Sequence, residues 1–348
     1  MNVAPHELQA YVRVLFTAAG LPENDAAVVA ENLVFADLRG VESHGVSRVP
    51  VYLRRLQEGA INPRPSIKVS GVHALCAVDG DGGMGAVVAS QAMRTVLEQA
   101  RRFGIGAAFV RNSNHFGMAS YYTLMAAREG MIGIATTNAP PAMAAWGGVE
   151  PVLGTNPLSI AFPAPDGGDP IVLDMATSTV ARGKIRLAAD RGEPIPQGWA
   201  LDASGKPTTD PAAALQGTLF PLGGVKGYCL AVAVDLLSGV FAGAGYANRL
   251  KQMYGRGRGV CVRSRVGHFL LAIDPGQVQP QSASADALRD FRARLQGGPR
   301  AGSAEILLPG ELEARFERVR RRDGIPLSEH TRRALAEVAH ELGISARL

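Results

Sequence analysis

The sequence has few cysteines, and this excludes two ways of stabilising a small fold. Its three cysteines, Cys76, Cys229 and Cys261, lie far apart and form no C-x-x-C pair. A disulfide framework and a structural zinc site both need closely spaced cysteines, so we expect neither. A reducing compartment fits this composition.

Long hydrophobic runs are also lacking. No stretch of about 18 apolar residues is present to span a bilayer, and the first residues do not show the basic-then-apolar pattern of a secretory signal. We therefore expect a soluble, cytoplasmic protein that has no membrane partner.

Lysine is scarce, with 5 residues against 31 arginines, and aromatic residues make up only 6% of the chain. The net charge of +5 comes from mixed charges, and over residues 311–323 glutamate and arginine alternate as on a solvated helix face. No basic patch carries the interleaved aromatics that bind single strands. We expect no nucleic-acid partner, and the positive charge suits a small anionic substrate. Lys184 and Lys226 stand out because each lies within a motif described below.

Apolar residues are abundant, at 47% of 348 residues, so a globular chain of about two domains is expected. Apolar spacing predicts a helix over residues 8–19, a second from Pro22 to about Leu38, and a third from about Ser47 to Glu58. Further helices alternate with short apolar strands, which indicates the α/β class. The predicted strands cover residues 75–78, 105–111, 132–137, 158–162, 171–173 and 268–273.

The joint between the second and third helices carries a reactive set of side chains. Ser43, His44 and Arg48 fall within seven residues, after a glycine, Gly40, that suits the left-handed end of a helix. Arg48 would lie in the first turn of the third helix and reach the same space as His44. Loops between rigid elements often carry catalytic groups, although turn chemistry alone also explains a histidine beside a glycine.

Residues 80–85 match the pattern G-x-G-x-x-G between a predicted strand and a predicted helix. This is the context of a Rossmann dinucleotide site, in which glycines let the backbone approach a pyrophosphate. The acidic residue that would bind the ribose is missing from the next strand, which ends in Arg111. A plain glycine-rich turn therefore remains the alternative.

Polar motifs follow two of the predicted strands, at residues 114–117 and 174–178, and a third motif, at residues 154–157, marks a turn before the strand at 158–162. Polar groups at successive strand ends can line one crevice. Residues 190–220 show no clear period, which predicts a long surface excursion. Lys226 then opens an apolar helix, where an ammonium and free backbone N–H groups suit a phosphate, although this is not a Walker loop.

Taken in order, these motifs resemble the malate/L-lactate dehydrogenase family of NAD(P)-dependent oxidoreductases over nearly the whole chain. The family also contains enzymes that act on sulfolactate, ureidoglycolate, 2,3-diketogulonate and cyclic imino acids such as piperideine-2-carboxylate. The motifs are Ser43-His44-Gly45 with Arg48, Asn114-His115-Phe116-Gly117, Gly154-Thr155-Asn156-Pro157, Asp174-Met175-Ala176-Thr177, Gly183-Lys184, Lys226-Gly227 and Leu308-Pro309-Gly310.

The resemblance implies a non-Rossmann NAD(P)-binding domain with a largely antiparallel sheet, plus a helical domain formed by N- and C-terminal segments. The expected divisions are residues 1–72, 73–275 and 276–348. The glycine pattern at Gly80 would then bind no cofactor. A homodimer with its active site completed across the interface is implied as well.

The resemblance also implies roles for individual residues, with NAD or NADP as cofactor and no metal. The catalytic residues would be Ser43, His44 and His115, and the substrate-binding residues Arg48, Thr155 and Lys184. The cofactor-binding residues would be His115, Phe116, Gly117, Asp174, Met175, Ala176, Lys226, Gly227, Gly310 and Glu311. Family members differ over which histidine is the acid/base, so both are kept. These residue types suit the reaction, because histidine exchanges protons near neutral pH and the arginine fork holds a carboxylate bidentately.

Lys184 distinguishes subgroups of the family. Imino-acid reductases resemble this chain up to Gly183 but then carry an aspartate, which completes a Ser-His-Asp relay. A lysine cannot stabilise an imidazolium as a carboxylate does. We therefore expect interconversion of a small 2-hydroxy acid and a 2-oxo acid, with cyclic imino acid reduction as the alternative and a non-catalytic binding protein as a third reading. Residues 245–265 depart from typical members, being rich in arginine and glycine.

Overall fold

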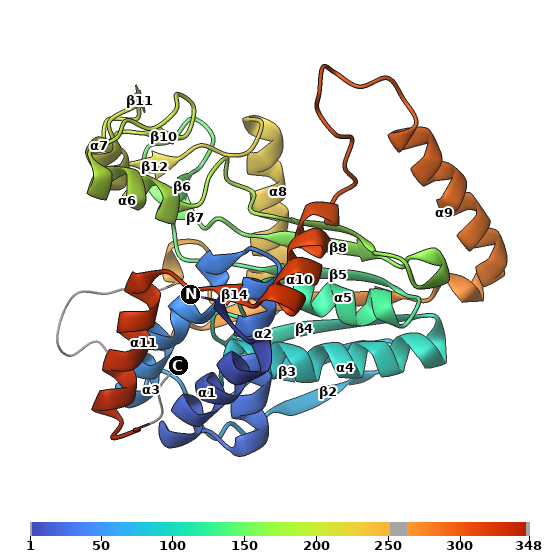
Figure 1. Ribbon diagram of the computed structural model, residues 1–348, viewed down its shortest axis with the longest axis horizontal. Coiled ribbons are helices and arrows are strands. Elements are labelled where there is room, and N and C mark those ends of the chain that lie inside the picture. The colour runs from blue at the N-terminus through green and yellow to red at the C-terminus, as the bar shows by residue number, and fades with distance from the viewer. Residues whose placement is uncertain (1, 251–262, 346–348) are drawn as a thin grey trace.

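Segments near the two ends of the chain lie side by side in the computed structural model (Figure 1). The structure describes residues 2–250 and 263–345. Strand β1 (Asn2–Val3) pairs antiparallel with β14 (Ile325–Pro326). Cys261 and most of the Arg/Gly-rich stretch at 245–265 fall outside the described residues.

Helices from both ends of the chain share one apolar core (Figure 1). The apolar spacing predicted for the first helix is confirmed, since Leu8, Val12, Leu15 and Phe16 are all fully buried. The group consists of α1 (Pro5–Ala18), α2 (Glu23–Leu38), α3 (Val49–Gln57) and α11 (Glu329–Glu341). These helices therefore form the support for the loop that carries His44.

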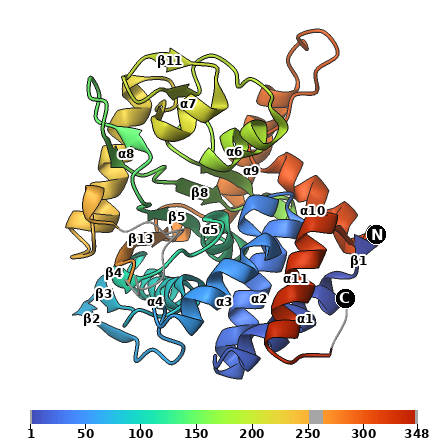
Figure 2. The ribbon, with the colours of Figure 1, turned by 90° about the vertical axis from the view of Figure 1, so that its left-hand side faces the viewer.

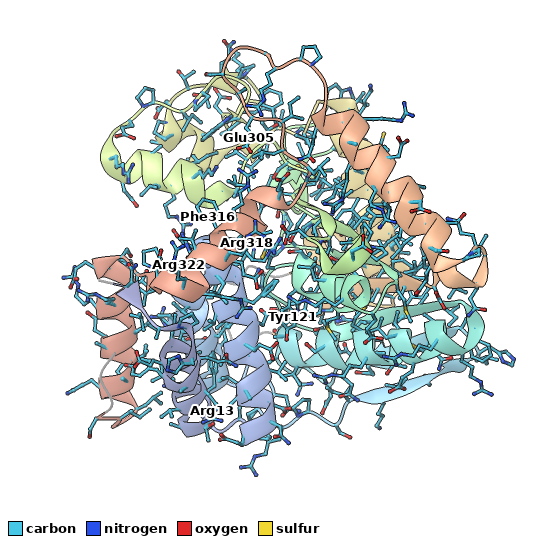
Figure 3. All side chains as sticks on the ribbon, turned by 45° about the vertical axis from the view of Figure 1, so that its right-hand side comes forward. Arg13, Tyr121, Glu305, Phe316, Arg318 and Arg322 are labelled. Carbon is cyan, nitrogen blue, oxygen red and sulfur yellow. The ribbon has the colours of Figure 1, made fainter. Side chains whose placement is uncertain are left out.

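Helix α2 also contacts the rest of the molecule, because it is buried on almost every side. Its Phe35 packs edge-on against Tyr121 of α5, with ring centroids 5.4 Å apart. Figure 3 labels Tyr121 at this boundary between the helical group and the sheet. Apolar residues on more than one face are expected in a helix that lies between two cores.

A seven-stranded sheet forms the centre of the fold, in the order β2-β3-β4-β13-β5-β8-β9. Every neighbouring pair is antiparallel except β3 and β4, so the expectation of a largely antiparallel sheet is confirmed. Helices α4 (Gly85–Phe103) and α5 (Ser120–Arg128) pack on it with one shared core. The strands are β2 (Lys68–Val72), β3 (Leu75–Asp79), β4 (Ile105–Ser113), β5 (Ile132–Thr137), β8 (Leu158–Phe162), β9 (Ile171–Met175) and β13 (Val266–Ile273).

A smaller lobe with its own core lies above the sheet in Figure 2. Residues 190–220, predicted as a long surface excursion, contribute three strands, a helix and buried core side chains to it. That prediction was wrong because strands of two residues carry no readable period. The lobe contains β6 (Met143–Ala144), β7 (Pro151–Leu153), α6 (Arg182–Arg191), β10 (Ala200–Leu201), β11 (Pro207–Thr208), α7 (Pro211–Gln216), β12 (Thr218–Leu219) and α8 (Val225–Asp235).

The C-terminal segment returns to the helical group through two further helices. Helix α9 (Gln281–Gln296) stands at the side of the molecule with none of its residues buried (Figure 1). Helix α10 (Glu311–Asp323) crosses the end of α2, where Glu317 forms a 3.0 Å ion pair with Arg39. Figure 3 shows α10 by its labelled Phe316, Arg318 and Arg322. The division at residues 72 and 275 stays a prediction, and the central stretch contains two separate cores.

Candidate active site

A short irregular segment after α2 carries His44. Gly40 adopts a left-handed conformation (φ +78°) as predicted, and two 3₁₀ turns follow, Glu42–His44 and Val46–Arg48. Asp37, in the last turn of α2, fixes this segment, since its Oδ2 accepts a hydrogen bond from the Val46 backbone N–H at 2.8 Å. A Cβ atom on Gly45 would lie 2.0 Å from Asp37 Oδ1, so only glycine fits beside the carboxylate.

Ser43, His44 and Arg48 are brought together by this segment. Ser43 Oγ lies 3.0 Å from His44 Nδ1, and the Arg48 Nε–H donates to the Ser43 carbonyl oxygen. Burial, and next the positive charge of Arg48, lower the pKa of His44 from 6.5 to about 4. His44 is therefore a neutral imidazole at pH 7.

His115 lies against His44, although 71 positions separate them in the chain. Their rings are stacked, with centroids 5.5 Å apart and planes 21° apart. His115 Nδ1 lies 2.6 Å from Tyr52 Oη and accepts the Gly117 backbone N–H at 3.2 Å. Tyr52 was missed by the sequence analysis, yet it lies four residues after Arg48 and so on the same helix face.

Buried groups hold the loop of residues 115–117 in place. The Tyr122 hydroxyl donates to the Phe116 carbonyl oxygen, and His268 stacks on the Phe116 ring with centroids 4.6 Å apart. His268 is itself fully buried and lies 2.8 Å from Thr137 Oγ1 and from Ser113 Oγ. Sequence reasoning placed His268 in a strand but gave it no role.

The helix that follows the glycine pattern of residues 80–85 does not have an exposed N-terminus. Asn114 Nδ2 donates to the carbonyl oxygens of Gly82 and Gly83, and a Cβ on Gly85 would lie 2.3 Å from the backbone of residues 114 and 115. The start of α4 is thus buried under the His115 loop, which leaves no space for a pyrophosphate. These glycines allow close backbone packing beside the histidine.

The end of β9 collects several of the predicted cofactor residues. Asp174 Oδ2 accepts the backbone N–H of Ser120, at the start of α5, at 2.8 Å. Burial raises the pKa of Asp174 to about 6. The Pro309 carbonyl oxygen accepts the Val172 N–H at 2.9 Å, so the chain before α10 pairs with β9. Asp174, Met175, Ala176, Gly310 and Glu311 therefore lie in one region.

The Glu311 carboxylate already has partners at the N-terminal end of α10. Its Oε2 accepts the Leu308 N–H at 3.0 Å, and its Oε1 forms a 2.9 Å ion pair with Arg315. This is the capping use of an acidic residue in a first helical turn. Gly310 is left-handed (φ +84°) and its Cβ would meet Val172 at 2.8 Å, so glycine is needed for this close approach.

Backbone hydrogen bonds join the loops of Thr155 and Lys226. The Thr177 N–H donates to the Thr155 carbonyl oxygen at 2.9 Å, and the Leu222 N–H donates to the Thr177 carbonyl oxygen at 2.8 Å. Helix α8 then begins after Gly224 without a side-chain cap, with Lys226 exposed in its first turn. Free N–H groups beside an ammonium fit the phosphate groups of a dinucleotide.

Lys184 lies exposed in the first turn of α6. Within the described part of the chain, it makes no hydrogen bond or ion pair with either histidine. Arg186, two residues later, is the α6 side chain whose charge acts on Arg48. Sequence reasoning missed Arg186, because thirty other arginines gave no reason to single it out.

Comparison with known proteins shows which family this chain belongs to. Residues 3–336 match the malate/L-lactate dehydrogenase family. An L-sulfolactate dehydrogenase from Methanocaldococcus jannaschii is 41% identical over 327 residues, which cover 94% of this chain and 93% of that protein. A malate dehydrogenase from Pyrococcus abyssi is 39% identical over 356 residues, covering 99% and 96%. The chain belongs to the malate/L-lactate dehydrogenase family.

Solved structures agree with this membership. The sulfolactate dehydrogenase of M. jannaschii superposes on this family member with a TM-score of 0.90, at 39% identity, over 99% of this chain and 98% of the other. A Δ1-piperideine-2-carboxylate reductase from Pseudomonas syringae pvar. tomato superposes with a TM-score of 0.85 at 29% identity, over 97% and 100%. A (2R)-3-sulfolactate dehydrogenase (NADP(+)) from Chromohalobacter salexigens is 40% identical over 258 residues, covering 74% and 76%.

As a member of the malate/L-lactate dehydrogenase family, the chain is an oxidoreductase of mixed α/β fold. Its described residues include no helix long and apolar enough to cross a membrane.

Proposed function

We propose that this protein interconverts a small 2-hydroxy acid and the matching 2-oxo acid by hydride transfer with NAD or NADP. One observation carries the proposal: two neutral histidines, His44 and His115, stack 5.5 Å apart beside the guanidinium of Arg48. An arginine can align a carboxylate while a neighbouring imidazole exchanges a proton with the adjacent oxygen.

The roles within the site follow from these neighbours. The nicotinamide, when bound, supplies or accepts the hydride. Arg48 holds the substrate carboxylate, and Ser43 lies within hydrogen-bond distance of His44. The Lys226–Gly227 helix end would bind phosphate groups, and Asp174 to Ala176 with Gly310 and Glu311 would line the rest of the dinucleotide site.

Substrates that carry a second anionic group fit this site best. Relatives about 40% identical are named for sulfolactate and malate, whereas the imino-acid reductase is 29% identical. Arg186 acts on Arg48 from α6 and offers a second positive charge. Lys184 remains a proposed substrate contact on the same helix.

A homodimer is part of the proposal. Helix α8 and the π-helical turn after it (Leu236–Val240) expose apolar side chains that a second copy would cover. These are Val225, Leu230, Leu236, Val240 and Phe241, of which Phe241 is 68% exposed. Light scattering coupled to size exclusion should give the mass of two chains, and a monomer mass would contradict this part. The cytoplasmic location stays a prediction.

The test is oxidation of NADH and NADPH, followed at the nicotinamide absorbance, with oxaloacetate, sulfopyruvate, pyruvate, 2,3-diketogulonate and piperideine-2-carboxylate. We expect turnover of an open-chain 2-oxo acid that falls at least 100-fold in His44→Ala and in Arg48→Ala. Turnover of the cyclic imine alone would replace the proposed substrate class. No turnover with either cofactor would contradict the proposal.

A further inference from the structure

The hydrogen bonds of His115 fix the position of its proton. Nδ1 accepts the backbone N–H of Gly117 at 3.2 Å, and an amide nitrogen can only donate. Nδ1 therefore carries no hydrogen. The hydroxyl of Tyr52, at 2.6 Å, must also donate to Nδ1. The single ring hydrogen of His115 then resides on Nε2.

The surroundings of His115 keep it neutral. The charged or titratable groups that act on it are Arg48, His44 and His268, and all three oppose a further positive charge. Burial acts in the same direction and is the largest cause, so the pKa of His115 lies well below 6.5. A neutral imidazole that loses its Nε2 proton would become an imidazolate, which is far too basic to form unless Nδ1 gains a proton at the same moment.

We propose that Tyr52 and His115 form a proton relay, in which the Tyr52 hydroxyl supplies Nδ1 with a proton as Nε2 gives its own to the substrate oxygen. This inference rests on the proposed function. As the carbonyl carbon receives the hydride, the electron pair of the C=O π bond moves to oxygen and forms the new O–H bond with the Nε2 proton. The O–H bond of Tyr52 breaks and its proton joins Nδ1, so His115 stays neutral and the negative charge remains on Tyr52 Oη.

The relay resets after the product leaves. One proton from the bulk solvent joins Nε2, and the Nδ1 proton returns to the Tyr52 oxygen, so the whole reduction consumes one solvent proton. In oxidation of the alcohol the same transfers run in reverse and begin from the phenolate. The proton count is therefore balanced in both directions.

The position of Tyr52 suits a transient negative charge. It lies one helical turn after Arg48 on α3, and its side chain is 4% exposed. Burial raises the pKa of Tyr52 to about 12, and Arg48 opposes this shift. The attraction is mutual, because burial lowers the pKa of Arg48 and Tyr52 opposes that shift. A phenolate is still less basic than the alkoxide that it replaces, so transfer toward the substrate is favourable.

The first test measures the tautomer in the protein without cofactor. Long-range ¹H–¹⁵N spectra of ¹⁵N-histidine-labelled protein, assigned with His115→Gln, should show His115 with a protonated Nε2 and an unprotonated Nδ1 from pH 6 to pH 8. A protonated Nδ1, or an imidazolium, in this range would overturn the relay. This measurement does not depend on knowing the substrate.

The second test counts the protons that are transferred during the reaction. In mixtures of H2O and D2O, the rate of the wild-type enzyme should depend on the fraction of D2O along a curve and not a straight line, because two protons are transferred in one step. Tyr52→Phe should lower kcat about 100-fold or more, as loss of a proton-transfer group does, and should change KM less than about threefold. The residual rate of Tyr52→Phe should vary linearly with the fraction of D2O. Tyr11→Phe removes a hydroxyl that bonds the Leu335 carbonyl oxygen and should keep the wild-type curve.

The outcomes separate the relay from the proposed function. A linear dependence in the wild-type enzyme, or the same curve in Tyr52→Phe, would overturn the relay while leaving the hydride transfer intact. Absence of turnover with every substrate and cofactor would overturn both. Because Tyr52 acts through His115, it is a positioning residue, and a merely structural role would not change the shape of the isotope curve.

Discussion

Replacing Gly45 with alanine should disable the His44 segment through one contact. The added Cβ would lie 2.0, 2.2 and 2.4 Å from Oδ1, Cγ and Oδ2 of Asp37. The backbone of Gly45 (φ −87°, ψ −153°) is extended and open to alanine, so the carboxylate is the obstacle. Asp37 is 2% exposed and has little space to move.

The cost can be worked out from two terms. Forcing a methyl group into a packed interior costs about 1–3 kcal/mol. Displacing the Asp37 carboxyl group also weakens its 2.8 Å hydrogen bond from the Val46 N–H, which contributes about 0.5–1.5 kcal/mol when the acceptor is neutral and about 1.5–3 kcal/mol when it is charged. Since the two terms share one movement, we expect a loss of about 3 kcal/mol in the free energy of unfolding.

The Gly45→Ala substitution should also lower kcat/KM of the protein that remains folded. Val46 begins the 3₁₀ turn that carries Arg48, so its displacement shifts the guanidinium relative to His44. A misplacement of about 1 Å costs roughly 100-fold in rate. Urea unfolding and kcat/KM for the best substrate would measure the two effects.

Two control variants make this prediction refutable. Gly298→Ala adds the same methyl group where nothing lies within 4 Å, and its unfolding free energy should change by less than about 0.5 kcal/mol. In an Asp37→Ser background the shorter side chain leaves space, so Gly45→Ala should cost much less than in the wild type. An equal cost in both backgrounds would show that the carboxylate is not the obstacle.

Three further predictions concern charge. Burial raises the pKa of Asp37 from its ordinary 3.8 to about 7, so the folded protein loses stability as the pH rises from about 4 to about 7. In urea unfolding, the free energy of unfolding of Asp37→Asn should therefore gain about 2–3 kcal/mol relative to wild type between pH 5 and pH 8. A difference between the two proteins that stays constant with pH would refute this. Lys226→Ala should raise KM for the nicotinamide cofactor about tenfold with kcat little changed, whereas Lys206→Ala, an exposed lysine of the β10–β11 turn, should not. Arg186→Ala should raise KM for sulfopyruvate about tenfold but KM for pyruvate less than threefold; a larger effect from Lys184→Ala would return the second anion contact to Lys184.

Much of the fold could be predicted from the chain because the long elements have strong periods. The first two helices and the strand at residues 132–137 were placed within about three residues, and the strand predicted over residues 105–111 continues to Ser113. The third helix, predicted from Ser47, begins at Val49 after a 3₁₀ turn. Helix α8 of the small lobe was predicted, but its strands β10, β11 and β12 were not, because strands of two residues each show no readable period.

The site could be predicted only where motifs mark it. His44, Arg48 and His115 lie in recognisable patterns and meet in space, whereas Tyr52 and Asp37 act through contacts that no local pattern shows. Tyr52 reaches a histidine 63 positions away in the chain. Asp37 looks like an ordinary polar residue near a helix end, and only its burial reveals that it fixes the following segment.

The central claim is that hydride passes directly to the carbon beside a carboxylate held at Arg48. The most direct test supplies NADH or NADPH carrying deuterium at either face of nicotinamide C4, with sulfopyruvate or oxaloacetate, and locates the label in the product by NMR. We predict deuterium at C2 of the 2-hydroxy acid from one face of one cofactor, and at least 100-fold slower formation of this labelled product in Arg48→Ala. Product that carries no deuterium from either face, or no consumption of either cofactor with any 2-oxo acid, would contradict the account.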